Sequence, residues 1–196
     1  MEWEDYVYEN GVLKNKFGIT DYEKLHQLEK TILVEKLTML VLNPIEGNFD
    51  SNHLKAIHKY LFEDIYEFAG KYREVNIFKK PPKFEEYNLI GSKLDELLKY
   101  AKEKEVNTNN QFEIARFLGD FYYNLIIIHP FREGNGRAIR EFLREFVMFK
   151  FKGYELEYSK IDSQNFLLGI TEKDTYPLLL AFEINNALTK VNVKSK

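Results

Sequence analysis

A short loop between two helical segments constrains the fold of this chain most. The apolar run over residues 121–128 has the period of a buried helix, and Pro130 disfavours the helical conformation at the residue before it, His129. The first helix is therefore expected to end at His129. After a turn flanked by glycines, a second periodic segment runs from residue 137 to residue 152. A base, an acid and two arginines thus meet at one junction between a loop and a helix.

This junction has the properties of a phosphate site. Gly134 and Gly136 free the backbone before the second helix, whose first N–H groups lack partners within the helix and favour an anion. Arg137 and Arg140 are three residues apart, so both guanidinium groups lie on one face near the first turn. Cations oppose the macrodipole at a helix N-terminus, so two arginines there fit better with a bound anion than without one. Together they could clamp a polyphosphate through forked hydrogen bonds.

The twelve residues 129–140, HPFREGNGRAIR, fill every fixed position of the signature HPFx[D/E]GNGRxxR, and by this motif the chain resembles Fic-domain proteins. Residues 11–19 and 49–70 are similar to the N-terminal segment and first core helices of stand-alone bacterial members. The resemblance implies one Fic domain over residues 1–196, with a helical extension over about 1–48 and a Fic core over about 49–190. The fold class it implies is all-α, mainly helical, with a small β-hairpin flap.

The activity that the resemblance implies is AMPylation by a protein adenylyltransferase. AMP would pass from ATP to a Ser, Thr or Tyr hydroxyl of a target protein, with release of pyrophosphate. His129 would take the hydroxyl proton as general base, because a neutral imidazole suits that task near pH 7. The negative end of the preceding helix would favour the imidazolium that forms.

The other signature residues would hold the nucleotide. Glu133 would ligate a Mg²⁺ ion that bridges the α- and β-phosphates. Asn135 and the loop amides would hold the α-phosphate oxygens, while Arg137 and Arg140 would neutralise the β- and γ-phosphates. Two glycines would let the backbone come close to the nucleotide, namely Gly134 and Gly136.

Several of these side chains also have a structural interpretation. Glu133 could complement the macrodipole in the first turn of the helix. The alternatives for the arginines are ion pairs along the helix, which are common and weak: Arg140 with Glu141 or Glu145, and Arg144 with Glu141.

Phe131 and the histidines outside the signature are expected to have no chemical role. Phe131 should anchor the loop in the core. His53 and His58 are five residues apart and do not share a helix face, as a metal-binding pair at i and i+4 would. Together with His26, they are expected to be structural or exposed.

Helical periodicity covers most of the remaining chain. The segment from Thr20 to Glu23 has the pattern of a capping box, so a helix is expected from about residue 21 to residue 42. Asp50 is the expected N-cap of a second helix that extends to Phe68, with Gly70 in the C′ position. Further helices are expected over residues 85–104, 111–128, 136–152, 162–170 and 175–188.

A short hairpin is expected between residues 72 and 84, where two consecutive prolines exclude a central strand. The resemblance places there the flap, an exposed strand that holds the target protein by strand addition, and residues 75–80, from Val75 to Lys80, are the candidate. Ile77 in this segment is a candidate nucleotide contact. Near the adenine, the candidates are Asn165 and Phe166. The alternatives are an ordinary edge hairpin and a core aromatic.

Composition restricts the partners. The chain of 196 residues has a formal net charge of −3, so no electrostatic footprint for nucleic acid is expected, and its lysine-rich end, from Lys190 to Lys196, is expected to be a frayed tail. There is no cysteine, no apolar N-terminal signal and no apolar run long enough to span a membrane. These features favour a cytoplasmic protein without membrane association and leave delivery into another cell open.

Regulation is where the sequence departs from the family. Many Fic proteins carry an inhibitory helix, [S/T]xxxE[G/N], whose glutamate pairs with the second signature arginine, here Arg140. No segment matches: residues from Thr31 to Glu35 begin the pattern, but Lys36 follows, and no room is expected for a C-terminal version. Either a small antitoxin supplies the helix, as in toxin–antitoxin pairs, or a segment absent from this chain does. Toxicity or cell filamentation on expression would follow if a common intracellular protein is the target.

Two alternatives to AMP transfer stay open. One is the transfer of another phosphate-containing group, as in family members with altered signatures, although the signature here is unaltered. The other is a non-catalytic nucleotide-binding module.

Overall fold

The structure, a computed structural model, describes residues 2–77, 83–172 and 178–191. Within these residues it is mainly helical, as predicted. The α-helices are α1 (Tyr22–Leu42), α2 (Ser51–Phe62), α3 (Ile90–Glu103), α4 (Gln111–Ile128), α5 (Asn135–Lys150), α6 (Ser163–Thr171) and α7 (Leu178–Ala187). Three 3-10 helices, η1 (Trp3–Tyr6), η2 (Tyr87–Leu89) and η3 (Tyr158–Lys160), and two short strands, β1 (Tyr154–Leu156) and β2 (Leu188–Lys190), complete the described elements.

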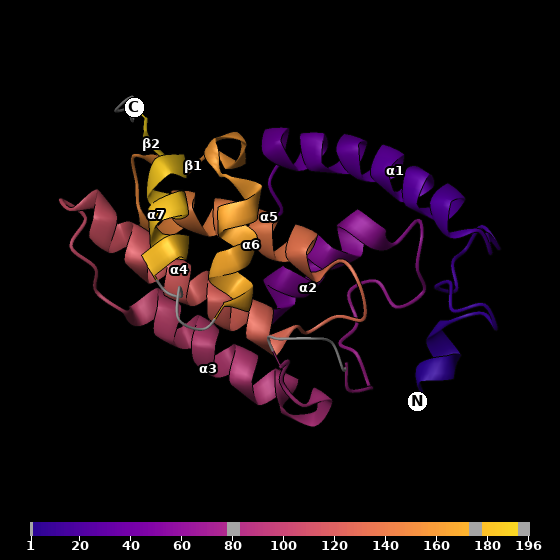
Figure 1. The fold of residues 1–196 in the computed structure, drawn as a ribbon. Helices are drawn as coiled ribbons and strands as arrows, with labels where there is room; N and C mark the ends of the chain where they lie inside the picture. Colours follow the sequence, from indigo (N-terminus) through magenta and orange to yellow (C-terminus); the bar gives the residue numbers. More distant parts are fainter. Residues whose placement is uncertain (1, 78–82, 173–177, 192–196) are drawn as a thin grey trace.

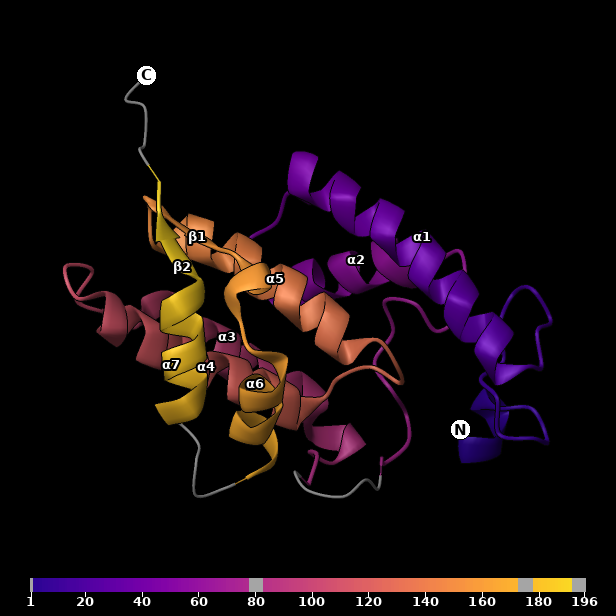
Figure 2. The ribbon, with the colours of Figure 1, turned by 45° about the horizontal axis from the view of Figure 1, so that its top comes forward.

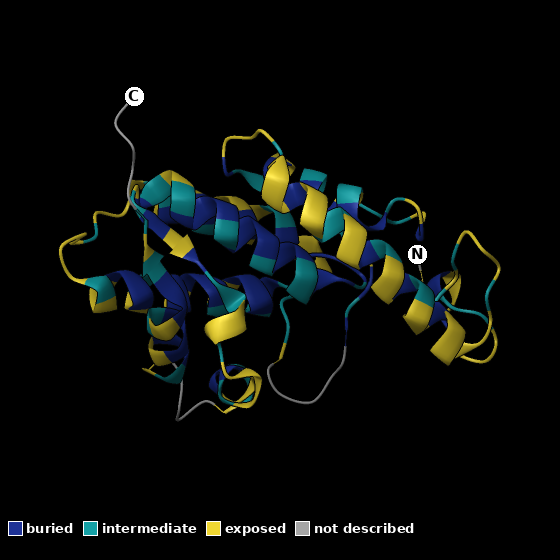
Figure 3. Ribbon diagram, turned by 90° about the horizontal axis from the view of Figure 1, so that it is seen from above, coloured by how far each residue is buried: buried dark blue, intermediate teal, exposed yellow. Residues whose placement is uncertain are grey.

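Helix α4 forms the centre of the fold. It packs against α3, α5 and α7, and α6 packs on α7 (Figures 1 and 2). Its sequence is apolar on most sides, and half of its residues are buried, which suits a helix that is covered by several neighbours. Helix α5 in turn contacts α2, and α1 lies across the outside of α2 with one face open to solvent (Figure 3). The loop between α4 and α5 is therefore held by two helices that each pack against several neighbours.

Short polar side chains begin the helices. Asp21 caps α1 by accepting a hydrogen bond from the Lys24 backbone N–H, and Asp50 caps α2 by accepting one from His53. The helix predicted from residue 21 is confirmed, but its cap is Asp21 rather than Thr20. Asn110 and Asp162 cap α4 and α6 in the same way.

Helix α2 ends at Phe62, earlier than the predicted end at Phe68. The chain turns because Gly70, with φ of 75°, lies against α2, where a Cβ would stand 2.8 Å from the Lys59 Cβ and 3.1 Å from the Lys55 carbonyl oxygen. Its N–H also donates to His58 Nδ1. A continuous helix to Phe68 could not fold back onto α2 in this way.

The region predicted as a hairpin is irregular where it is described. Residues 72–77 and 83–84 form no strand, and residues 78–82, which include much of the candidate flap, lie outside the described residues. Glu85 also departs from prediction: its N–H donates to the Ile127 carbonyl, and α3 begins only at Ile90. Backbone groups that bind α4 are not available for a helix starting at residue 85.

The two-stranded sheet lies elsewhere in the chain. Strands β1 and β2 are antiparallel, with Tyr154 opposite Lys190 and Leu156 opposite Leu188. They join the chain after α5 to the chain after α7. Lys190 is therefore part of the sheet and not of a frayed tail, while residues 192–196 lie outside the described residues.

The N-terminal segment docks on the signature loop. Val7 and Leu13 form an isolated antiparallel bridge, and Trp3 lies in η1. The guanidinium carbon of Arg132, the variable position of the signature, lies 3.7 Å from the centroid of the Trp3 ring. Arg132 itself is buried, which lowers the pKa of its guanidinium.

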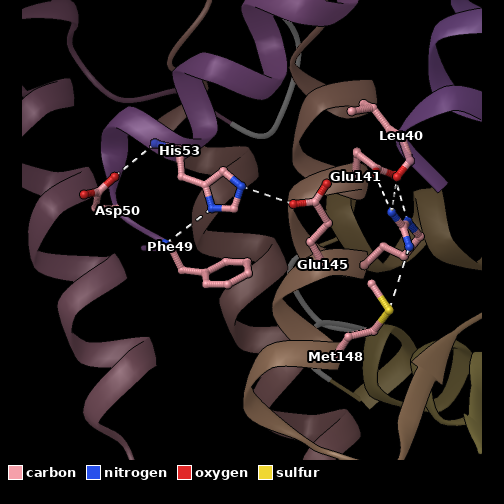
Figure 4. A network of polar contacts seen from close by, with 8 residues as sticks. Leu40, Phe49, Asp50, His53, Glu141, Glu145 and Met148 are labelled. Atoms are coloured by element: carbon pink, nitrogen blue, oxygen red, sulfur yellow. Dashed lines mark hydrogen bonds and ion pairs between the residues drawn. The ribbon is translucent and has the colours of Figure 1, made fainter. Parts of the chain in front are cut away.

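A polar network is buried between α2 and α5 (Figure 4). His53 Nε2 lies 3.1 Å from Glu145 Oε2, and His53 Nδ1 accepts from the Phe49 N–H. Burial raises the pKa of Glu145. Arg144 pairs with Glu141 at 2.6 Å, as predicted, and also reaches the Leu40 carbonyl. His53 is thus structural, in agreement with the sequence analysis.

No helix in the described parts of the chain has both the length and the apolar character that crossing a membrane requires.

Candidate active site

His129 forms the C-cap of α4 and has a left-handed backbone, with φ of 46° and ψ of 61°. Few residues other than glycine adopt this conformation, and it costs free energy that the surroundings must supply. The imidazole Nδ1 lies 3.2 Å from the Ile126 carbonyl oxygen. Because a carbonyl only accepts, Nδ1 carries the proton and Nε2 keeps its lone pair. In the neutral ring, Nε2 is therefore the nitrogen that can accept a proton.

Arg73 holds this conformation in place. Its Nε donates to the His129 carbonyl at 2.8 Å, and its backbone N–H donates to the Pro130 carbonyl at 2.9 Å. The other guanidinium nitrogens donate to the carbonyls of Val75 at 2.8 Å and Glu85 at 2.5 Å. Arg73 is 1% exposed, and burial lowers the pKa of its guanidinium. This one side chain joins the end of α4 to both sides of the undescribed segment 78–82.

Phe84 covers the face of the base. Its ring stacks on the imidazole of His129, with centroids 3.8 Å apart and planes 14° apart. The sequence analysis singled out neither Arg73 nor Phe84, because both lie more than 40 residues before the signature. No local sequence signal marks either one.

The side chain of Asn135 closes the loop through the backbone of Phe131. Its Oδ1 accepts from the Phe131 N–H and its Nδ2 donates to the Phe131 carbonyl, each at 2.8 Å. The residue is 2% exposed. Both ends of the amide are thus bound to Phe131, and the prediction that Asn135 holds the α-phosphate oxygens stays a prediction. Phe131 is fully buried, as predicted.

Gly134 and His58 fix the backbone before α5. Gly134 has φ of 80°, and a Cβ there would lie 2.3 Å from the Phe62 ring. His58 Nε2 lies 2.9 Å from the Glu133 carbonyl oxygen, and its ring stacks on Phe131 at 3.7 Å. Burial lowers the pKa of His58 to about 4, so the ring is neutral and donates through Nε2. The predicted structural role of His58 is confirmed by this position.

Glu133 is the exposed acid of the loop. Its Oε1 accepts from the Gly134 N–H at 2.9 Å and lies 3.4 Å from Arg137 Nη2, and its side chain is 37% exposed. Among the described residues only Oε1 is engaged, which leaves Oε2 for a metal ion. No group of three or more metal-binding side chains occurs in the described chain. A single carboxylate with substrate oxygens is nevertheless the usual Mg²⁺ arrangement, so Glu133 fits that ion.

Arg137 lies between two carboxylates and lines the cavity at the start of α5. Its Nη1 lies 3.0 Å from Glu29 Oε2 on α1, and its guanidinium lies 4.8 Å from the Phe62 ring centroid. Tyr66 donates to the other oxygen of Glu29. These two contacts use two of the five N–H donors of the guanidinium, and the role of Arg137 toward the β- and γ-phosphates stays a prediction. Neither Glu29 nor Tyr66 was identified from the sequence.

Arg140 differs from Arg137 in its neighbours and lies beside the Tyr122 hydroxyl. It forms no ion pair with a carboxylate in the described part of the chain, since Glu141 binds Arg144 and Glu145 faces His53. A Cβ at Gly136 would lie 3.3 Å from Arg140 Nη1, so the guanidinium lies close to the first turn of α5. The predicted place of Arg140 beside an anion site is consistent with this geometry.

Of the three other candidate contacts, Phe166 and Ile77 are buried and Asn165 is half-buried. Phe166 packs against Tyr122 with ring centroids 4.8 Å apart, and Asn165 donates to Glu183. Ile77 is 7% exposed and directly precedes the undescribed segment 78–82. Phe166 thus has the core position that was its alternative.

A cavity of about 630 Å³ brings the charged groups together. It lies between the N-terminal segment, α1 and the start of α5. The charged and polar side chains that line it include Glu29 on α1, Tyr66 after α2, and, from the signature, Arg132, Glu133, Arg137 and Arg140. The first N–H groups of α5 have no partners within the helix and, with the arginines, favour an anion in this cavity. The carboxylates of the lining favour a cation bound to that anion.

Comparisons with known proteins agree with this site. Residues 48–147 match the Fic/DOC family. The protein adenylyltransferase VbhT of Bartonella schoenbuchensis is 36% identical over 157 residues, which are 80% of this chain and 32% of VbhT. The probable protein adenylyltransferase y4lH of Sinorhizobium fredii is 31% identical and is covered over 80% of both chains. The chain thus spans about a third of the length of the first relative and most of the second.

A solved structure shares the fold. The BepC protein of Bartonella tribocorum, a VirB-translocated effector with bound AMPPNP, superposes with a TM-score of 0.80 at 24% identity. The match covers 96% of this chain and 98% of BepC.

Proposed function

The chain belongs to the Fic/DOC family, and from this premise we propose that it is a protein adenylyltransferase. It would transfer AMP from ATP to a hydroxyl of a target protein and release pyrophosphate. The observation that carries the proposal is the His129 imidazole, whose Nδ1 donates to the Ile126 carbonyl in the neutral ring and leaves Nε2 as the acceptor, six residues before the start of α5 at Asn135. The relatives named protein adenylyltransferases support the same class of reaction.

The proposed reaction begins with proton transfer. Nε2 of His129 accepts the proton of the target hydroxyl as its oxygen attacks the α-phosphorus. A new oxygen–phosphorus bond forms, and the bond from the α-phosphorus to the β-bridging oxygen breaks. Both electrons of that bond leave with pyrophosphate. The imidazolium is favoured by the C-terminal end of α4, where carbonyl groups face it.

The phosphates are held by the start of α5. Its first N–H groups face the α-phosphate, and Arg140 binds the terminal phosphates through charge-assisted hydrogen bonds. When bound at Glu133, Mg²⁺ would neutralise charge that develops on the pyrophosphate. Asn135 acts indirectly, because its amide fixes the loop that presents these N–H groups.

The proposed partners follow from this reaction. The target protein would lie along residues 75–80, of which 78–80 are outside the described residues, and it would present its hydroxyl to His129. We place the reaction in a cytoplasm, either of the cell that makes the protein or of a cell that receives it. BepC, which shares the fold, is described as translocated.

An assay with α-labelled ATP and a cell lysate tests the proposal. Label should appear on one or more lysate proteins in the presence of Mg²⁺. The His129→Ala variant should lose about 10²- to 10⁴-fold of the transfer rate and keep its ADP affinity. If label were transferred by the variant at the parent rate, His129 would not be the base. If neither protein transferred label while both bound ATP, the non-catalytic binding module would replace the proposal.

A second assay separates AMP transfer from the other enzymatic alternative. Mass spectrometry of a labelled target should show the mass of AMP on a Ser, Thr or Tyr residue. A different phosphate-containing adduct would assign the chain to that other reaction.

A further inference from the structure

Glu29 is a buried carboxylate that reaches the signature from another part of the chain. It lies on α1, is 6% exposed, and places Oε2 at 3.0 Å from Arg137 Nη1. The Tyr66 hydroxyl donates to Oε1. Burial, followed by the hydrogen bond to Glu29, raises the pKa of Tyr66, so the hydroxyl stays protonated and remains a donor. Glu29 is thus fixed at both oxygens.

Arg137 passes this restraint on to Glu133. Its planar guanidinium uses Nη1 for Glu29, Nη2 for Glu133 and one face for the Phe62 ring. A guanidinium cannot rotate one of its nitrogens without moving the others. The position of Glu29 therefore sets the orientation of Arg137, and Arg137 in turn limits where the Glu133 carboxylate lies.

Stability alone gives a weak reason for such a pair. Taking two charges out of water costs about as much free energy as their attraction returns, so apolar side chains of similar volume often serve a core equally well. Helix α1 otherwise contacts the protein mainly through apolar residues such as Leu25, Leu33 and Leu40. A glutamate between them at residue 29, opposite a signature arginine, points to a role at the site.

The two signature arginines differ in their carboxylate partners. Arg137 lies between two carboxylates, whereas Arg140 has no carboxylate partner in the described chain. Arg140 can therefore bind the terminal phosphates while Arg137 stays with Glu29. An inhibitory glutamate would instead be expected to form an ion pair with Arg140.

We infer that Glu29 is a positioning residue, which acts through Arg137 to hold the Glu133 carboxylate where it binds Mg²⁺ with the nucleotide. The inference rests on the proposed function, because it assigns a role within the same site. It makes α1, outside the matched residues 48–147, a working part of the site.

The test compares two substitutions on the same helix. Glu29→Gln keeps the size of the side chain and removes its charge, while Glu35→Gln makes the same change at an exposed position. Calorimetric titration with ADP is carried out with and without Mg²⁺ for both variants and the parent. Thermal unfolding is measured in parallel, and transfer of labelled AMP is measured where the parent shows it.

For Glu29→Gln we expect the gain in ADP affinity that Mg²⁺ gives the parent to fall by about tenfold, the usual effect of losing a residue that orients a metal ligand. Affinity for ADP without Mg²⁺ should be unchanged or higher, because one negative charge near the phosphates is gone. Transfer should slow in kcat more than in KM. Tyr66→Phe should give a smaller change in the same direction, and Glu35→Gln should match the parent.

Three results would overturn the inference. Equal Mg²⁺ gains in Glu29→Gln and Glu35→Gln would leave Glu29 with a role in folding only. Faster transfer by Glu29→Gln would make Glu29 a competitor of the phosphates. Lower affinity with and without Mg²⁺, together with a lower melting temperature, would indicate general damage to the site. A parent that binds Mg²⁺ and ADP but transfers no label contradicts the proposed function alone, because the calorimetric comparison still decides the role of Glu29.

Discussion

At the scale of single residues, the two signature arginines have different surroundings despite their equal chemistry. Arg137 is held by carboxylates from α1 and from the loop. Arg140 is close to the first turn of α5, and its guanidinium is near the Tyr122 hydroxyl, whose pKa burial raises and Arg140 lowers. Position relative to neighbouring acids, rather than residue type, therefore distinguishes the two arginines, and the roles proposed for them differ accordingly.

Arg140→Ala is expected to weaken ATP binding about tenfold more than ADP binding, because a charge-assisted hydrogen bond to the terminal phosphate is lost. Calorimetric titration with both nucleotides measures the difference. Arg137→Ala, on the same helix, serves as the comparison and should weaken the two nucleotides to a similar extent. Equal losses of ATP and ADP in Arg140→Ala would remove this residue from the terminal phosphate.

At the scale of secondary-structure elements, the junction between α4 and α5 depends on backbone conformations that need outside support. His129 and Gly134 both have positive φ, at the end of α4 and the start of α5. Arg73 binds the carbonyl groups at the first point, and His58 binds the Glu133 carbonyl at the second. The loop keeps its shape because side chains from α2 and from the segment after it satisfy its backbone groups.

Gly134→Ala is expected to destabilise the protein by about 2 kcal/mol or more, because a Cβ is strained at this φ and collides with the buried Phe62 ring. Thermal or denaturant unfolding measures the change. The matched control is Gly91→Ala in α3, where a Cβ meets nothing within 4 Å. That substitution should stabilise the protein by about 0.5–1 kcal/mol. A Gly134→Ala protein as stable as the parent would show that the turn tolerates a side chain.

At the scale of the whole molecule, the fold couples its stability to the protonation of His58. The pKa of this histidine falls from 6.5 to about 4 in the folded protein because burial disfavours the charged ring. Between pH 6.5 and about pH 4, the unfolded chain binds more protons than the folded one. The free energy of unfolding therefore decreases as pH falls below 6.5 and levels off below about 4. The folded state is thus expected to be most stable near neutral pH.

The His58 contribution should be on the order of 3 kcal/mol between pH 6.5 and pH 4. Denaturant unfolding of the parent and of His58→Asn at several pH values measures it, because the difference between the two proteins removes the common effect of other groups. The parent should lose more stability than the variant as pH falls. Identical pH slopes would mean that His58 titrates alike in both states.

Inhibition of AMP transfer is expected to come from outside the residues described. Glu35 is exposed on α1, and the α1 carboxylate that meets the signature is Glu29 on Arg137. The chain should therefore transfer AMP without activation, and a small protein that places a glutamate on Arg140 should silence it, because a pair shielded from water competes with the terminal phosphate.

Bacterial growth is the measurement for this last prediction. Expression of the chain should be toxic or cause filamentation, co-expression with a small protein that carries the pattern [S/T]xxxE[G/N] should restore growth, and the His129→Ala form should be harmless. A purified chain that stayed inactive until Glu35 was substituted would place the control within α1.

The sequence by itself determined the features that depend on neighbours along the chain. The end of α4 at His129 followed from Pro130, and the helical fold followed from apolar periodicity. Both were predictable because helix periods, caps and proline effects act over a few residues. The signature likewise lies within twelve consecutive residues, so the family was readable without a fold.

Only the tertiary structure decided how the site is held. Arg73 reaches His129 across 56 residues, and Glu29 reaches Arg137 across 108. Asn135 binds the backbone of its own loop, a choice that depends on the buried Phe131 beneath it. Such contacts arise when helices that are distant in sequence pack against one another, and no periodic pattern encodes which buried polar groups then meet.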